Sequence, residues 1–146
     1  MLAVDTNVLV YAHRREADEH AIAAGVVRGL AEGASAWAIP WPCVYEFFSV
    51  VTNPRIWKDR ADTPAQAWAQ LDAWFGSPSL QLLAEPSGFQ GTLGPIIAHA
   101  RIRGPVVHDA RVAAICLAHG ATCATRNVKD FQHTGVELVD PWNVDA

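Results

Sequence analysis

The sequence predicts an α/β fold, specifically a three-layer α/β/α sandwich with a central parallel sheet. Short apolar runs of strand length alternate with segments of helical periodicity along the whole chain. Such alternation is typical of parallel strands that are joined by right-handed helical crossovers. The chain has 146 residues, of which 51% are hydrophobic and 18% charged, and no repeat or linker divides it. We therefore expect residues 1–146 to form a single domain with one core.

The chain is expected to begin with a strand and two helices. The apolar run Leu2–Val4 ends at Asp5 and leads directly into a helix over residues 7–13. The Ala-rich segment 17–31 carries apolar residues at helical spacing, and Gly33 follows it as a C-cap would. These residues predict a strand that feeds the first layer of helices.

A second strand and two further helices follow. Residues 36–39 predict the strand, and Pro42 suits the first turn of a helix over Cys43–Val51 that Asn53-Pro54 ends. Thr63 and Pro64 have the residue types of an N-cap and a first helical position, so the next helix is expected over Pro64–Phe75.

The second half of the chain continues the alternation. Residues 80–83 predict a third strand, followed by a helix over residues 88–102 that Gly104-Pro105 closes. A compact helix is expected over Asp109–His119. Residues 121–125 and 136–139 predict the last two strands.

Composition excludes several classes of protein. No apolar run reaches the length of a membrane span, and no basic segment precedes the first apolar stretch, so we expect a cytoplasmic protein without a membrane anchor. The three cysteines (Cys43, Cys116 and Cys123) are too few and too widely spaced for a disulfide framework or a zinc site. The net charge of −4 argues against a protein that grips nucleic acid through its phosphates.

Three acids stand where an α/β fold forms its ligand sites, beyond the carboxyl ends of the strands. Asp5 ends the first strand, and Asp109 opens a helix after the apolar stretch 105–107. Glu46 lies inside a helical stretch that is otherwise nearly all apolar, and Asn127 follows the penultimate predicted strand. These four side chains are the candidates for a site.

Each candidate also has a structural explanation. Asp5 and Asp109 could cap the helices that they precede, and Asn127 could be a turn residue. Glu46 has no capping role, so it lies either on the solvent edge of its helix or in the interior, where it must be paired or bind a metal. Carboxylates that meet in one cleft repel each other, and Mg²⁺ or Mn²⁺ relieves that repulsion. Such an ion also activates water against a phosphodiester.

Four segments occur in order along the chain: D-T-N-V-L-V-Y-A, E-F-F-S-V-V-T-N-P-R, V-H-D-A-R-V-A-A-I and T-R-N-V-K-D-F. With them the whole chain resembles the PIN-domain ribonucleases, specifically the VapC-type toxins of bacterial and archaeal toxin–antitoxin pairs. The resemblance implies a Mg²⁺- or Mn²⁺-dependent endoribonuclease toxin, which a cognate antitoxin inhibits and which is usually a homodimer.

The resemblance also implies roles for single residues. Asp5, Glu46 and Asp109 match the first, second and third acids of the family and are the expected catalytic metal ligands, and Thr6 matches a hydroxyl residue that helps to order the site. The fourth acid is missing. Aligned on the threonine of T-R-N-V-K-D-F, Asn127 replaces it and would orient water or the ion. Aligned on the phenylalanine, Asp130 is the nearest carboxylate, or else a structural residue of the turn.

Basic and aromatic residues have two interpretations each. Arg111 and Arg126 lie within two residues of proposed site residues, which makes them candidates for contact with RNA phosphates. The remaining bases near the motifs either contribute to RNA contact or are scattered solvated charge: Arg14, Arg15, Arg55, Lys58, Arg60 and Lys129. The apolar stripe around Trp68 on the predicted helix 64–75 indicates either core packing or a surface for an antitoxin helix or a second subunit.

Two other functions are alternatives to this one. A haloacid-dehalogenase-like phosphatase needs a second acid two residues after the first, and that position is Asn7. A catalytically inactive PIN-like domain that binds RNA or protein is the stronger alternative, because Asn127 supplies no charge. Metal-dependent cleavage that is lost with a chelator and in Asp109→Asn distinguishes the enzyme from the binding module.

Overall fold

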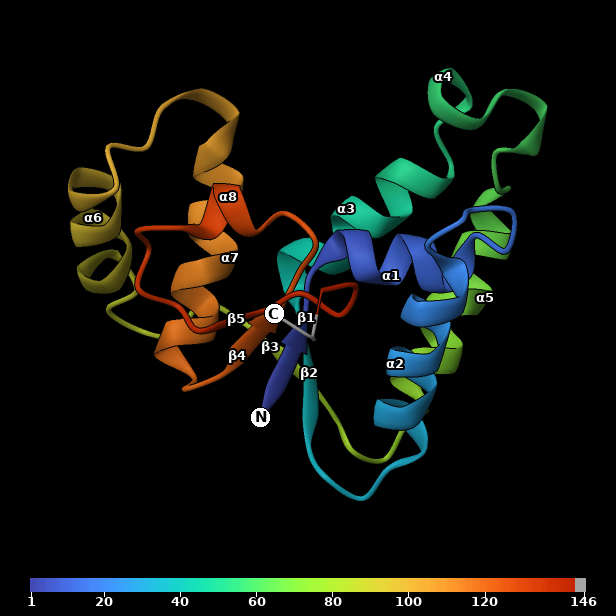
Figure 1. Ribbon diagram of the computed structural model, residues 1–146, viewed down its shortest axis with the longest axis horizontal. Helices are drawn as coiled ribbons and strands as arrows, with labels where there is room; N and C mark the ends of the chain where they lie inside the picture. The colour runs from blue at the N-terminus through green and yellow to red at the C-terminus, as the bar shows by residue number, and fades with distance from the viewer. Residues whose placement is uncertain (144–146) are drawn as a thin grey trace.

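The computed structural model describes residues 1–143 and contains a five-stranded sheet in the order β3-β2-β1-β4-β5 (Figure 1). All four pairs of neighbouring strands are parallel, as the alternation predicts. The chain moves outward from β1 to β3 and then returns to place β4 on the other side of β1. The strands are β1 (Leu2–Val4), β2 (Trp37–Pro40), β3 (Leu80–Leu83), β4 (Thr122–Ala124) and β5 (Leu138–Val139).

Helices form the two outer layers, which confirms the predicted α/β/α sandwich. On one side lie α1 (Thr6–His13), α2 (His20–Glu32), α3 (Trp41–Val51) and α5 (Pro64–Phe75). On the other side lie α6 (Gln90–His99), α7 (Val107–Ala118) and α8 (Val128–Phe131) (Figure 1). The short helix α4 (Pro54–Trp57) and a 3₁₀ turn at Lys58–Arg60 connect α3 to α5.

The predicted elements agree with the structure except at several boundaries and at two short helices. The strands Leu2–Val4 and Leu80–Leu83 and the helix Pro64–Phe75 have the expected bounds. The helices α4 and α8 were not predicted. Asn53-Pro54 indeed ends α3, but the Asn53 side chain also accepts a hydrogen bond from the Arg55 backbone N–H and starts α4.

The core lies between the sheet and both helical layers. Its largest fully buried side chains come from every part of the fold and include Trp37, Phe47, Leu71, Ile115 and Phe131. On α5, Leu71 and Trp74 are buried whereas Trp68 is 54% exposed, so the stripe packs into the core along part of its width only. All three cysteines are buried and free, and no helix among residues 1–143 is long and apolar enough to cross a membrane.

The structure contradicts both interpretations of Arg14, contact with RNA and scattered solvated charge. Its side chain is buried, and its guanidinium donates hydrogen bonds to the Arg60 carbonyl at 2.8 Å and to the Val51 carbonyl at 3.0 Å. The same group lies 4.0 Å from the centre of the Trp57 ring. Arg14 therefore ties the end of α1 to the α3–α5 connection and is withdrawn from the solvent.

Candidate active site

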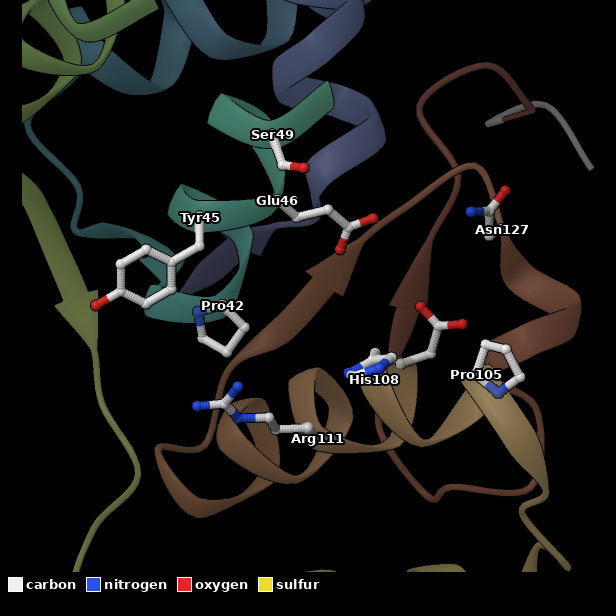
Figure 2. A pocket seen from close by; sticks show the side chains of 9 residues that line it. Pro42, Tyr45, Glu46, Ser49, Pro105, His108, Arg111 and Asn127 are labelled. Atoms are coloured by element: carbon white, nitrogen blue, oxygen red, sulfur yellow. The ribbon is translucent and has the colours of Figure 1, made fainter. Parts of the chain in front are cut away.

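The reversal of strand order brings the candidate residues to one end of the sheet. Asp5 follows β1 and Asn127 follows the neighbouring strand β4, while α3 supplies Glu46 and the first turn of α7 supplies Asp109. Cavities of about 520 and 330 Å³ adjoin here, and Glu46, Asp109 and Asn127 line both. The smaller cavity also reaches Asp5 and Thr6. The sequence-predicted acids thus share one cleft, part of which Figure 2 shows.

Asp5 both caps a helix and belongs to the cleft, so its two interpretations are compatible. The residue is 4% exposed, and one carboxylate oxygen accepts a hydrogen bond from the Thr6 backbone N–H at 2.8 Å as the N-cap of α1. The other oxygen accepts from the Thr125 hydroxyl at 2.8 Å and from the Asn7 amide at 3.1 Å. These bonds hold the carboxylate in one orientation at the end of β1.

Asn7 and Thr125 are site residues that the sequence analysis missed. The Thr125 hydroxyl accepts hydrogen bonds from the Asn7 side chain and from the Asn127 backbone N–H, both at 3.0 Å. The Asn7 side-chain oxygen in turn accepts from the Arg126 backbone N–H at 3.0 Å. Both residues lie inside the D-T-N and T-R-N segments. Their presence in those motifs was the available signal, although neither is charged.

Glu46 and Asp109 occupy opposite walls of the cleft. Glu46 lies on an exposed edge of α3, as one interpretation held, but that edge faces the cavities. Asp109 is not the cap of its helix, because α7 begins two residues earlier and Val106 occupies the N-cap position. The Asp109 carboxylate is therefore free to face the cleft from the first turn of α7.

Burial raises the pKa of all three carboxyls, and repulsion from neighbouring acids raises it further for Glu46 and Asp109. For Asp5 burial is the main cause, and the hydrogen bond from Thr125 opposes it. For Glu46 burial comes first and the charge of Asp5 second. Burial, followed by the charges of Asp5, Asp130 and Glu46, raises the pKa of Asp109 to about 7. The cleft therefore concentrates negative charge that a cation would stabilise.

The residues of the cleft fit a hard divalent cation whose shell is completed by water. Within residues 1–143, no three side chains of His, Cys, Asp or Glu are gathered closely enough to hold a metal by themselves. Mg²⁺ commonly uses one or two carboxylates and keeps several waters. The Thr6 hydroxyl is buried in the cleft wall without a hydrogen-bond partner among the described residues, and such water would satisfy it.

Of the remaining predicted site residues, Arg111 lines the cleft, whereas Arg126 and Asp130 do not. Arg111 lines the larger cavity, with its guanidinium paired to Glu85. Arg126 lines neither cavity, and its guanidinium lies 5.2 Å from the centre of the Trp142 ring. Asp130 likewise lines neither cavity and acts on Asp109 through its charge. Asn127 is therefore the residue after β4 that reaches the cleft.

Solved structures share this architecture. FitAcB from Neisseria gonorrhoeae superposes with a TM-score of 0.72 at 19% identity, covering 99% of this chain and 100% of that one. VapBC2 from Rickettsia felis, bound to a DNA fragment of its promoter, has a TM-score of 0.69 at 20% identity and covers 94% and 96%. A toxin–antitoxin complex from Klebsiella pneumoniae has a TM-score of 0.64 at 17% identity and covers 97% and 98%. The parallel sheet and its helical layers thus form a PIN-type domain.

Curated relatives give the family. Ribonuclease VapC43 of Mycobacterium tuberculosis is 33% identical over 122 residues, which cover 84% of this chain and 82% of the relative. Ribonuclease VapC24 of the same organism is 29% identical over 148 residues and covers both chains fully. No family model matches. The 33% identity to VapC43 over most of both chains shows that this chain belongs to the VapC family of toxin ribonucleases. It is therefore a nuclease.

Proposed function

We propose that this chain is a Mg²⁺- or Mn²⁺-dependent endoribonuclease in which Asp5, Glu46 and Asp109 hold one divalent ion. The observation that carries the proposal is that three carboxyls with raised pKa values line adjoining open cavities, Glu46 and Asp109 in both and Asp5 in the smaller one. When bound, the ion supplies an activated water and neutralises charge on the phosphoryl group. Membership in a ribonuclease family agrees with RNA as the substrate.

The chain's own residues would orient the reaction. Asp5 is held by Thr6, Asn7 and Thr125, so its carboxylate needs no rearrangement when substrate arrives. Glu46 and Asp109 would flank the scissile phosphate from opposite walls, and either carboxylate can accept a proton from the attacking water. Asn127 offers an amide that orients water without adding charge to the cleft.

The proposal includes a cognate antitoxin that inhibits the enzyme, a homodimeric assembly and a cytoplasmic location. The Klebsiella pneumoniae neighbour is a toxin–antitoxin complex, which supports a protein partner of that kind for this chain. Sequencing upstream of the gene shows whether a small reading frame lies there. Coexpression of such a frame with this chain, followed by copurification and mass measurement, tests both the antitoxin and the dimer.

Cleavage of total RNA tests the chemistry. We expect cuts with Mg²⁺ or Mn²⁺ and none with EDTA. In Asp5→Asn and Asp109→Asn the cleavage rate should fall by at least about 10²-fold, because each substitution removes a carboxylate charge that would hold the divalent ion. Asp59→Asn is the matched control, because Asp59 is an exposed acid that lines neither cavity. Full metal-dependent activity in Asp5→Asn would show that the assignment is wrong.

The inactive binding module is the second candidate, and the neutral Asn127 favours it. In that case the wild-type chain would bind RNA or a protein but leave RNA intact with either metal. The variant Asn127→Asp, tested for RNA cleavage and metal affinity, also distinguishes the ribonuclease from the inactive binding module. A gain in activity or in metal affinity would mean that the missing charge limits an existing enzyme.

A further inference from the structure

One face of α3 forms a wall of the larger cavity. Pro42, Tyr45, Glu46 and Ser49 line that cavity, and their spacing places them in one stripe along the helix. Pro105, His108 and Asp109 form the facing wall. Figure 2 shows Tyr45 and Glu46 leaving the same turn of α3, with the Glu46 carboxylate directed toward Asn127 and the tyrosine ring directed away from it.

The Tyr45 ring is exposed and supported from behind. The residue is 63% exposed, the largest value among the exposed large hydrophobic residues of the described chain. Trp41, one turn earlier on α3, stacks against it with ring centres 6.0 Å apart and planes inclined by 28°. The ring therefore presents a flat surface to the cavity whose position is set by its neighbour. Such a surface has little conformational freedom to lose when a ligand stacks on it.

We propose that Tyr45, supported by Trp41, is a stacking platform for the RNA base next to the scissile phosphate. The inference rests on the proposed ribonuclease function and names a contact for its substrate. A phosphodiester held at Glu46 and Asp109 leaves the adjoining base within the same cavity, where Tyr45 is the aromatic lining residue. Every base has a π-face, so stacking contributes affinity without requiring one sequence.

Tyr45 also borders an apolar groove of about 410 Å³ between α3 and α5, which Trp41, Phe48 and Trp68 line. A second copy of the chain is the other occupant that this face could take. RNA is favoured for the ring itself because Tyr45 lies in the same cavity as Glu46, Asp109 and Asn127. Trp68 lines the groove but not that cavity, which makes it the matched control.

The test compares base-containing and abasic RNA. The probe is a fluorescein-labelled single-stranded RNA of about 12 nucleotides, and its competitor has the same length with abasic sites in place of the bases. Affinities are measured by anisotropy with Ca²⁺ in place of Mg²⁺, and cleavage is measured separately with Mg²⁺. We expect Tyr45→Ala to weaken binding of the base-containing RNA about tenfold, since one base–aromatic stack contributes this much. The abasic RNA should bind wild type and variant equally.

Tyr45→Phe should keep the affinity because it keeps the ring, and Trp68→Ala should bind both RNAs as wild type does. In cleavage, Tyr45→Ala should raise KM with little change in kcat. Equal loss for base-containing and abasic RNA, or no loss in Tyr45→Ala, would overturn the platform. A change of molecular mass in Tyr45→Ala, measured by light scattering, without a change in RNA affinity would also overturn it and assign the face to a second copy. If the wild type cleaves no RNA but shows the stacking preference, the proposed function fails, and Tyr45 stands as a stacking platform for a base of bound RNA.

Discussion

Asp5 shows at the scale of one residue how a structural and a chemical role coincide. Its carboxylate caps α1 through the Thr6 N–H and accepts hydrogen bonds from Asn7 and Thr125. These donors lower the pKa of Asp5, while burial raises it more strongly. The capping interaction therefore sets the orientation of the carboxylate. Burial outweighs hydrogen bonding and raises its pKa, so a bound cation would stabilise the charged form.

Asp109 leads to a prediction on pH. Its pKa rises from the ordinary 3.8 to about 7, so the folded protein binds this proton more tightly than the unfolded chain does. The contribution of Asp109 to stability is then fully present below about pH 4 and is lost as the pH rises through about 7. In EDTA, the free energy of unfolding measured with urea should decline over this range, and Mg²⁺ should reverse the decline at the upper end.

Asp109→Asn is the control for this pH dependence. The variant cannot lose the proton, so the decline in EDTA should become shallower, and the stabilisation by Mg²⁺ should shrink. The proton on Asp109 also competes with the cation, so the wild type should need more Mg²⁺ for half-maximal activity at about pH 6 than at about pH 8. A wild-type unfolding energy that rises between pH 5 and about 7 by the same amount as in Asp109→Asn would contradict the shift.

At the scale of elements, α3 carries most of the chemistry of one wall. Its buried face, with Cys43, Val44 and Phe47, packs into the core, whereas Tyr45 and Glu46 on the adjoining face line the cavity. The helix could be predicted from Pro42 and the apolar pattern. The sequence could not predict whether the exposed edge of α3 faces bulk water or a cleft, because that depends on α7, which lies opposite.

Arg14 gives a prediction for the connection between α3 and α5. Arg14→Met keeps an apolar stem but removes the side-chain donor of the Arg60 carbonyl and the charge beside the Trp57 ring. The Val51 carbonyl loses one of its two donors and keeps the Asp62 backbone N–H. We expect a loss of about 1–3 kcal/mol in the free energy of unfolding. Faster amide hydrogen exchange over residues 52–62 should accompany it.

Arg15→Met is the matched control, since Arg15 is the exposed neighbour in the same segment. Its effect on the unfolding energy should stay within about 0.5 kcal/mol. Equal unfolding energies for the two variants would mean that the buried guanidinium contributes nothing beyond the packing of its stem.

At the scale of the whole molecule, the net charge of −4 limits how RNA is held. Arg14 is buried, Arg111 is paired with Glu85 and Arg126 lines neither cavity, so none of these three arginines is an unpaired cation lining the cleft. We expect log K for a single-stranded RNA to fall with log salt at a slope between about −0.7 and −1.4, the value for one or two neutralised phosphates. Anisotropy titrations from about 50 to 200 mM salt measure it, and a slope steeper than about −3 would contradict it.

The same acidity explains why composition alone pointed away from RNA. Part of the negative charge is concentrated in Asp5, Glu46 and Asp109, whose neutralisation by a cation would reverse the local field. RNA would then meet an ion in a cleft and an aromatic ring, and would depend little on a basic surface. The family membership agrees with that interpretation and not with the one from total charge.

By itself the sequence determined the order of strands and helices, the acids at the strand ends and the family, because apolar periodicity and short motifs are local properties of the chain. Only the tertiary structure decided that Asn7 and Thr125, 118 positions apart, meet beside Asp5. It also decided that Arg14 is buried and that Tyr45 shares a cavity with Glu46 and Asp109. The physical reason is that hydrogen bonds, burial and raised pKa values arise between elements distant in sequence, and their packing sets which groups lose water together.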